Sequence, residues 1–396
     1  MGYSLGFWLE DDTISQSDSD EPKNSDEHKN KVELHINYWS LEAKQACNYL
    51  DIGLRLNLFR YKELKSINFY FPFKMEKENY MGNLGNVICS KDELIELIFN
   101  EKLKSSSDGV NYKDIRFLGD EDKGLRVYKE LEIGDDPNDV KFIVNEDSES
   151  TKVSIPKAII KHEESDDLYH YFRFRLKLSS KQVRILSQNY EPEDRLVVSK
   201  FEKIEVIDFR LNELRDLPAT ICNHLNNNFI LEQIHLFIIR DIHDELKLSH
   251  DKYKRCRLLE KEVWNEYLHF KTEKAALPTQ MLIYHFDKKD KKDKKDKNGE
   301  NEFNHIDRFN AFAKFVRVKV TFVNILAFVF SVIILGSLGS LIATVFIESR
   351  PNGIYFWAKH WFFHFFIGLC MIYMIYRILH TFWKGNFKLQ WPIRRS

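Results

Sequence analysis

The sequence predicts an α+β cytosolic region followed by a C-terminal transmembrane hairpin of two helices. Strand patterns and short amphipathic helix patterns share residues 31–286, a mixture typical of the α+β class. No charged residue lies between Lys319 and Glu348, a run of 28 residues, whereas about 20 apolar residues suffice to cross a bilayer. A second apolar segment, 361–383, carries aromatic side chains at both ends, as membrane interfaces favour.

The N-terminal part begins with an arm and a strand. Residues 1–30 are rich in Ser, Asp and Glu, so we expect a disordered acidic arm there. Alternating apolar residues in VELHINYW predict a strand at 32–39. The stretch 40–56 predicts a helix that Gly53 ends. Two further patterns follow, a strand at 67–73 and an amphipathic helix at 91–101.

The rest of this region is rich in strand patterns. Between residues 169 and 179, Phe172 and Phe174 face one way, and Arg173 and Arg175 face the other, where we expect solvent. The other predicted elements are strands at 124–133, 140–147 and 229–241, a strand with a polar turn at 201–218, a helix at 251–268 and a strand at 279–286.

Charge is unevenly distributed along the chain. From residue 301 to the end there are eleven Lys and Arg against three Asp and Glu, although the whole chain has a formal net charge of −1. An acidic body with a basic, apolar tail indicates membrane attachment. Because cations flank the two crossings on their outer sides, the positive-inside rule places both termini in the cytoplasm. We therefore expect a multi-pass protein of the cell inner membrane.

The C-terminal part divides into six predicted segments. They are a Lys/Asp-rich linker at 287–302, an interfacial amphipathic helix at 303–319, transmembrane helix 1 at 320–347, a short external loop at 348–360, transmembrane helix 2 at 361–383 and a basic cytosolic tail at 384–396.

Small and polar residues inside the predicted hairpin suggest helix–helix contact. Small residues four apart let two helix backbones approach closely, and the partner is either the second helix of the hairpin or another subunit. The predicted contact residues are Gly336, Gly339, Ser340, Ala343 and Thr344. The predicted intramembrane polar residues are His364, Tyr373, Arg377 and His380, which either snorkel to the interface or line a wet seam in an oligomer.

The sequence contains no familiar catalytic signature. It lacks a phosphate-binding loop, a dinucleotide fingerprint, an HExxH helix and a GxSxG turn, so no catalytic, cofactor-binding or metal-binding residue is predicted. The five cysteines are scattered without a CxxC pair, which argues against disulfides and zinc.

Four polar stretches leave alternatives open. One could be assembled into a metal site but fits a charged loop better; its residues are Asp241, His243, Asp244, His250 and Asp251. Another suits structural pairing at a strand end better than catalysis; its residues are Asp208, Arg210, Asn212, Glu213 and Arg215. The basic and aromatic stretches YFRFRLKL and KYKRCRLLEK allow a nucleic-acid surface, although solvated strand and helix faces explain them more simply.

The phrases DIGLRL, INFYFPF, IDFRLNELRDLP and LLEKEVWNEYL, together with the predicted architecture, resemble two-transmembrane effector proteins of bacterial anti-phage defence systems, including the retron-associated type. The resemblance implies an effector that stays silent until a partner senses infection and then damages the inner membrane. The implied partner is an inhibitory protein or a ribonucleoprotein such as a reverse transcriptase with its nucleic acid.

The leading expectation is therefore a membrane-embedded effector of abortive infection. Its cytosolic region would control a homo-oligomer of hairpins that permeabilises the lipid bilayer, with no cofactor and no small-molecule substrate. The alternatives are a membrane-anchored cytosolic enzyme acting on nucleic acid, or a membrane scaffold.

Overall fold

The computed structural model describes most of the chain before residue 348. The described residues are 3–11, 30–41, 47–57, 64–159, 168–190, 201–225, 229–249, 253–268, 280–289, 306, 308–318, 322–347, 368, 369 and 373. They belong to two units, each treated by itself: Met1–Pro192 with Glu202–Val318, and Glu193–Phe201 with Lys319–Ser396.

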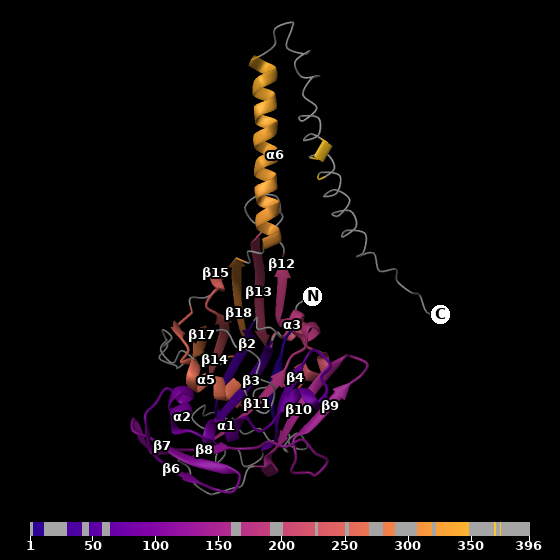
Figure 1. Ribbon diagram of the computed structural model, residues 1–396. Helices are drawn as coiled ribbons and strands as arrows, with labels where there is room; N and C mark the ends of the chain where they lie inside the picture. Colours follow the sequence, from indigo (N-terminus) through magenta and orange to yellow (C-terminus); the bar gives the residue numbers. More distant parts are fainter. Residues whose placement is uncertain are drawn as a thin grey trace, which may run out of the picture. The chain divides into compact units, whose positions relative to one another are not determined.

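A ten-stranded sheet forms the centre of the first unit (Figure 1). Its strands are β2 (Asn30–Leu41), β3 (Cys47–Leu56), β5 (Tyr80–Met81), β6 (Leu103–Asp108), β7 (Tyr112–Phe117), β8 (Asp120–Tyr128), β11 (Leu168–Lys177), β14 (Phe229–Asp241), β16 (Arg255–Leu258) and β17 (Met281–Lys289). Their order is β16-β17-β14-β2-β3-β11-β8-β7-β6, and β5 pairs with β11 beside this path. The pairs β14–β2 and β11–β8 are parallel.

Two four-stranded antiparallel sheets complete the strand content of the described residues. The first contains β1 (Gly6–Asp11), β4 (Leu64–Phe71), β10 (Ser150–Pro156) and β9 (Lys141–Asn145), in that order. The second contains β12 (Ser187–Tyr190), β13 (Glu202–Leu211), β18 (Phe309–Val318) and β15 (Glu245–Ser249), in that order.

The ten-stranded sheet is the middle layer of three. One of its faces shares a single apolar core with both four-stranded sheets, to which Ile36, Phe69 and Phe315 contribute. Its other face packs against helices through a second core, to which Trp39, Leu94 and Trp264 contribute. The helices of this unit are α1 (Leu84–Cys89), α2 (Asp92–Phe99), α3 (Ser180–Leu186), α4 (Ala219–Cys222) and α5 (Lys261–Leu268).

The two small sheets are joined by backbone pairing at the start of the chain. The Leu5 amide donates to the Arg210 carbonyl at 2.9 Å, and the Asn212 amide donates to the Leu5 carbonyl at 2.8 Å. Asn212 has a φ of 56°, and its side-chain amide hydrogen-bonds the backbone of Phe7 in both directions. Asparagine tolerates this left-handed conformation better than most residues.

The predicted charge pairing at the end of β13 is confirmed. Arg210 pairs with Asp208 at 2.5 Å and with Asp216 at 2.7 Å, while Arg215 lies 3.6 Å from Glu213. The charged residues of this stretch pair with one another, as the prediction of structural pairing rather than catalysis expects.

Most predicted strands are confirmed, because alternation is a direct signal of a strand with two different faces. The patterns at 32–39, 67–73, 140–147 and 229–241 lie in or overlap β2, β4, β9 and β14. The pattern at 201–218 contains β13, and the patterns at 169–179 and 279–286 overlap β11 and β17. The short helix predicted at 91–101 contains α2. The helix predicted at 251–268 is correct only in its second half, α5, because β16 lies in its first half.

Two predicted helices are wrong. The stretch 40–56 contains the end of β2 and all of β3, in which Leu50, Ile52 and Leu54 alternate with the other face. The predicted interfacial helix at 303–319 contains β18, where buried residues recur at every second position. In both segments the buried apolar residues recur at every second position, so a strand places them all on one buried face. A helix would turn some of these apolar side chains toward solvent.

The predicted α+β class is also corrected, since strands dominate the described residues. The second unit contains one long helix, α6 (Phe322–Ile347), whose side chains are described without a break only over residues 328–340. Within the described part of the chain, no helix is both long and apolar enough to cross a membrane. This finding contradicts the predicted transmembrane hairpin and the predicted multi-pass inner-membrane localisation.

The two glycines of the predicted contact seam have no described atom packed against them. A Cβ built on Gly336 or Gly339 meets no described atom within 4 Å, and the Ser337 hydroxyl donates to the Ile333 carbonyl of its own helix at 2.8 Å. Of the predicted intramembrane polar residues only Tyr373 is described, with its ring centroid 6.2 Å from that of Phe330. The side chain of Thr344 and all of His364, Arg377 and His380 lie outside the described residues.

Gly53 generates a stability prediction. A Cβ at this position would lie 2.3 Å from the Tyr171 hydroxyl, so Gly53→Ala should overpack the sheet and cost about 1–3 kcal/mol. Gly119→Ala is the matched control, because no described atom lies within 4 Å of a Cβ built at this position. Urea unfolding followed by circular dichroism measures both, and equal midpoints for the two variants would contradict the close packing.

Candidate metal centre

Two adjacent rows of largely polar side chains cross the helix-facing side of the ten-stranded sheet. The strand register aligns the first row as Asp287, His235, His35, Gly53 and Arg173. It aligns the second row as His285, Phe237, Asn37, Asp51 and Arg175. Because the second row is two residues along each strand, both rows lie on one face.

These rows are buried rather than solvated. Arg173 is 2% exposed, His285 is 4% exposed, and Asp51 and Arg175 are both 0% exposed. Buried polar groups at this density need hydrogen-bond or charge partners, so the arrangement of those partners determines what the face can do.

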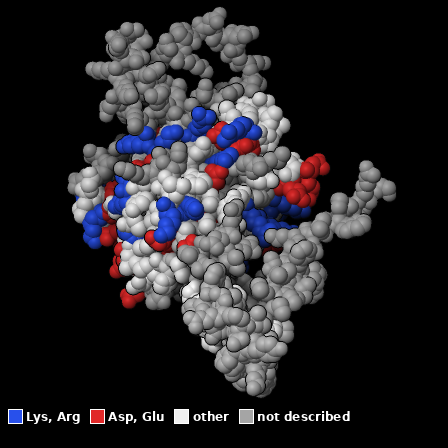
Figure 2. Space-filling view, turned by 90° about the horizontal axis from the view of Figure 1, so that it is seen from above, with Lys and Arg blue, Asp and Glu red and all other residues white. Residues whose placement is uncertain are grey.

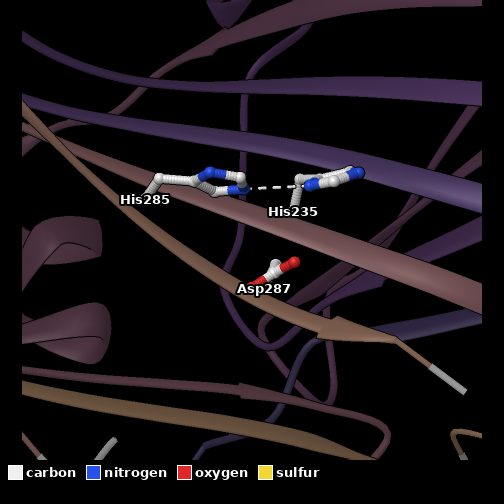
Figure 3. Close-up of side chains that lie close together, drawn as sticks. All are labelled: His235, His285 and Asp287. Carbon is white, nitrogen blue, oxygen red and sulfur yellow. Dashed lines mark hydrogen bonds between the residues drawn. The ribbon is translucent and has the colours of Figure 1, made fainter. Parts of the chain in front are cut away.

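Three potential metal ligands gather at one end of the rows (Figure 3). His235 lies on β14, and His285 and Asp287 lie two residues apart on β17, so their side chains point to the same face of the sheet. One ligand atom from each residue lies within 4.8 Å of the others. The closest pair is His235 Nδ1 and His285 Nε2, which share a hydrogen bond at 2.9 Å.

The surroundings keep both imidazoles neutral at neutral pH. Burial lowers the pKa of His235 to about 4 and the pKa of His285 to about 3. Neutral imidazole is the form that binds metal ions. The Nδ1 atom of His285 is buried and has no hydrogen-bond partner in the described part of the chain. Phe237 stacks on the His285 ring with centroids 4.4 Å apart, which holds the ring in position.

Asp287 supplies the acidic group of the cluster. Burial by itself raises the pKa of Asp287, but the hydrogen bond and charge of Lys254 hold the pKa below its ordinary value. The Lys254 Nζ atom lies 2.7 Å from the carboxylate, and the lysine side chain is half exposed. Asp287 is therefore an ionised carboxylate whose present partner is an exchangeable surface cation.

His35 connects this cluster to the arginines of the rows. Its ring lies edge-on to that of His235 with centroids 5.0 Å apart, and its Nδ1 atom lies 3.4 Å from the Tyr171 hydroxyl. Arg173 donates to that hydroxyl at 2.8 Å. Burial holds the pKa of His35 well below its ordinary value, and the neighbouring charges, including those of Arg173 and Arg55, act in the same direction.

The far end of the rows is held by a fully buried ion pair. Arg175 donates to both oxygens of Asp51, at 2.6 and 2.9 Å. Trp39 Nε1 and the Tyr267 hydroxyl also donate to Asp51, at 2.8 and 2.7 Å. Burial by itself raises the pKa of Asp51, but the charge and hydrogen bonds of Arg175 hold it below its ordinary value.

The alternative metal site considered from the sequence is not assembled. Asp244 accepts from Arg240 at 2.9 Å and from Arg317 at 2.5 Å, and Arg240 also donates to Glu205 at 2.8 Å. Asp241 is paired with Arg317 at 3.4 Å, whereas His243 is exposed on the turn. His250 and Asp251 lie outside the described residues. This network of two arginines and three carboxylates joins β14 to β13 and β18.

The proposed nucleic-acid surface on YFRFRLKL is also not supported by burial. Arg173 and Arg175 face the interior, so they cannot line a surface for a nucleic acid. On the face shown in Figure 2, lysines and arginines lie beside aspartates and glutamates rather than apart from them. His235, His285 and Asp287 were not predicted from the sequence. The only signal is the alternation of polar and apolar residues in QIHLF and YHFD, whose polar residues share a face of the sheet with Arg173.

Comparisons with known proteins add little. No protein-family model and no curated protein matches the chain. A solved structure of an M1 zinc metallopeptidase from Deinococcus radiodurans shares 7% identity over 73% of this chain and 41% of that chain, with a TM-score of 0.20. A two-domain M1 zinc metallopeptidase bound to L-arginine shares 8% identity over 73% and 42%, with a TM-score of 0.21.

This chain thus spans less than half the length of those peptidases, and the TM-scores are too low to indicate a shared fold. Neither similarity bears on the predicted kinship with anti-phage effectors, on the abortive-infection role or on the inhibitory or ribonucleoprotein partner. These stay predictions.

Asp51 generates a second stability prediction. Asp51→Asn removes the only described counterion of Arg175 and should cost about 3–5 kcal/mol, as removal of one partner of a buried ion pair does. Asp147→Asn, at an exposed turn, is the control and should cost less than about 0.5 kcal/mol. Denaturant unfolding at pH 7 measures both; a loss below about 1 kcal/mol in Asp51→Asn would refute this role.

The two neutral histidines predict acid sensitivity. In the unfolded chain they take up protons near pH 6.5, but in the folded chain only near pH 4 and pH 3. The unfolded state therefore binds more protons between these values, so their stabilisation is complete above about pH 6.5 and falls as the pH drops toward 4.

The measurement is the urea midpoint of chelator-treated protein at pH 7 and pH 5. The wild-type midpoint should fall more than that of a His235→Gln/His285→Gln variant. Equal falls in the two proteins would show that these histidines titrate normally.

Proposed function

We propose that this chain binds a divalent transition-metal ion, with zinc as the first candidate, through His235, His285 and Asp287. The observation that supports this is the convergence of two neutral imidazoles, one buried and one partly buried, and an ionised carboxylate within 4.8 Å on neighbouring strands. Imidazole nitrogen and carboxylate oxygen are ordinary zinc ligands.

The spacing of the two imidazoles fits a common ion. Two nitrogens at ordinary zinc–nitrogen distances on a tetrahedral ion are about 3.3 Å apart. His235 Nδ1 and His285 Nε2 are 2.9 Å apart and share a hydrogen bond, so binding requires them to give up that bond, separate slightly and turn both lone pairs toward the ion. Asp287 must approach further and give up its pairing with Lys254, which ties metal affinity to that lysine.

Three protein ligands leave one tetrahedral position for water or another exogenous ligand. That arrangement is typical of catalytic zinc sites, whereas structural sites usually close all four positions with protein ligands. A bound zinc ion would supply Lewis acidity at this position. The function that we propose is therefore a metal-dependent enzyme with an exchangeable ligand position.

The residues around the site have defined roles in this proposal. His35 lies against His235 and presents a neutral imidazole next to the ligands, and its surroundings oppose its protonation. Phe237 covers one side of His285 and limits access of water.

Metal binding is the direct test. Chelator-treated full-length protein should bind about one Zn²⁺ or Co²⁺ per chain by calorimetry, with Co²⁺ giving a visible absorption band. His235→Gln and His285→Gln should each weaken binding more than about 100-fold, beyond the 10–100-fold cost of changing a group behind the ligands. His243→Gln, at an exposed histidine outside the cluster, is the control and should bind normally.

Lys254→Met separates a metal centre from a structural histidine pair. Removing the cation that competes for Asp287 should strengthen metal binding at constant pH. Absence of stoichiometric binding in the wild type, or equal binding by all the histidine variants, would overturn the proposal.

A further inference from the structure

The arginines beside the candidate metal centre are not matched by acidic groups. Asp51 is the only carboxylate in the described rows near Arg173, and Arg175 already occupies both of its oxygens. Trp39 and Tyr267 donate to the same carboxylate, so its acceptor capacity is largely used. Two guanidinium groups therefore share one carboxylate in a buried environment.

Of the two guanidinium groups, Arg173 is the one that makes no direct ion pair among the described residues. It is 2% exposed, and its only hydrogen bond among the described residues is the 2.8 Å bond to the Tyr171 hydroxyl. Its Nε atom is buried without a partner in the described residues. A buried guanidinium with unused donors carries a large desolvation cost unless an anion compensates it.

The neighbours of Arg173 add positive charge and a polar contact. Tyr171 lies between Arg173 and His35, and Gly53 leaves the space that the Tyr171 hydroxyl occupies. Arg55 lies on the adjacent row opposite Tyr171, with its side chain 20% exposed, and pairs with Glu33 at 3.5 Å. Arg55 also has a buried Nε atom without a described partner.

We infer that Arg173, with Tyr171 beside it, forms a binding subsite for an oxyanion group of a ligand, a carboxylate or a phosphate. The planar donors of a guanidinium match the paired oxygens of both groups, and low local dielectric strengthens such bonds. The subsite rests on Arg173 itself. Its role in holding an anionic substrate for the metal rests on the function proposed above.

This arrangement would place two parts of one ligand at two neighbouring positions. His35 separates the subsite from His235 on the same row of the sheet, so an anionic tail at Arg173 would orient another group toward the open metal position. The ligand class is then an acid or a phosphate ester rather than a neutral or cationic molecule.

The test uses inorganic phosphate and acetate as probes of the two anion classes. Each is titrated calorimetrically into full-length protein in a chloride buffer, once metal-free and once loaded with zinc. Wild-type protein should bind at least one of the two anions in both states. Arg173→Gln should weaken that binding more than about tenfold while the zinc titration stays unchanged. Phosphate alone binding would indicate a phosphate ester, and acetate alone a carboxylate.

Two further variants provide a conservative replacement and a control for this test. Arg173→Lys keeps a positive charge but loses the paired donors, so it should bind the anion more weakly than wild type and more tightly than Arg173→Gln. It also serves if Arg173→Gln fails to fold, which circular dichroism would show. Arg116→Gln, at an exposed arginine of the same sheet, should bind like wild type.

The outcomes separate the two proposals. Zinc binding without binding of either anion, or anion binding that Arg173→Gln and Arg173→Lys leave intact, overturns the subsite and leaves the metal centre standing. Anion binding that depends on Arg173 without any zinc binding supports the subsite and overturns the metal centre.

Discussion

The buried pair of Asp51 and Arg175 is the interaction on which the helix-facing side of the central sheet depends. It joins β3 to β11 directly, and it joins β2 and α5 through the side chains of Trp39 and Tyr267. Removing two charges from water is expensive, and only dense hydrogen bonding offsets the cost. Here the carboxylate accepts four hydrogen bonds, and Arg175 also donates to the Tyr267 carbonyl at 3.1 Å.

That pair also shapes the site beside it. Because Asp51 is committed to Arg175, Arg173 remains positive and without an acid of its own. From Arg173, side-chain contacts lead through Tyr171 and His35 to a cluster that includes Asp287. A shift of one residue in any of these strands would move its polar residues into the apolar core on the opposite face. The register that protects the core therefore also assembles the site.

The sequence pattern predicted where most strands lie, but not which of their faces is buried. Alternation in VELHINYW and in YHYFRFRLKL separates two faces, but it does not tell which face meets solvent, so Arg173 and Arg175 were expected outside. They lie inside because helices cover this side of the sheet and Asp51 compensates one charge. The segment 40–56 was predicted as a helix ended by Gly53, but it contains β3, both faces of which are buried.

The candidate site could not be predicted from spacing. His235 and His285 are 50 residues apart, and they meet only because β17 pairs with β14. The position of β14 beside β2 is a parallel pairing between segments far apart in the chain, and no local motif announces it. Familiar metal motifs place ligands a few residues apart on one element, which is why a motif search passes over this one.

The parallel pairing of β2 with β14 sets an order of events during synthesis. His35 and its partner His235 are separated by two hundred positions, and β17 follows later still. A ribosome must therefore release nearly the whole first unit before any of the proposed ligands can meet, and contacts between such distant segments form slowly. Until β14 pairs with β2, one edge of β2 is unpaired. The nascent chain would therefore lack the proposed metal centre and would be prone to associate with strands of other molecules.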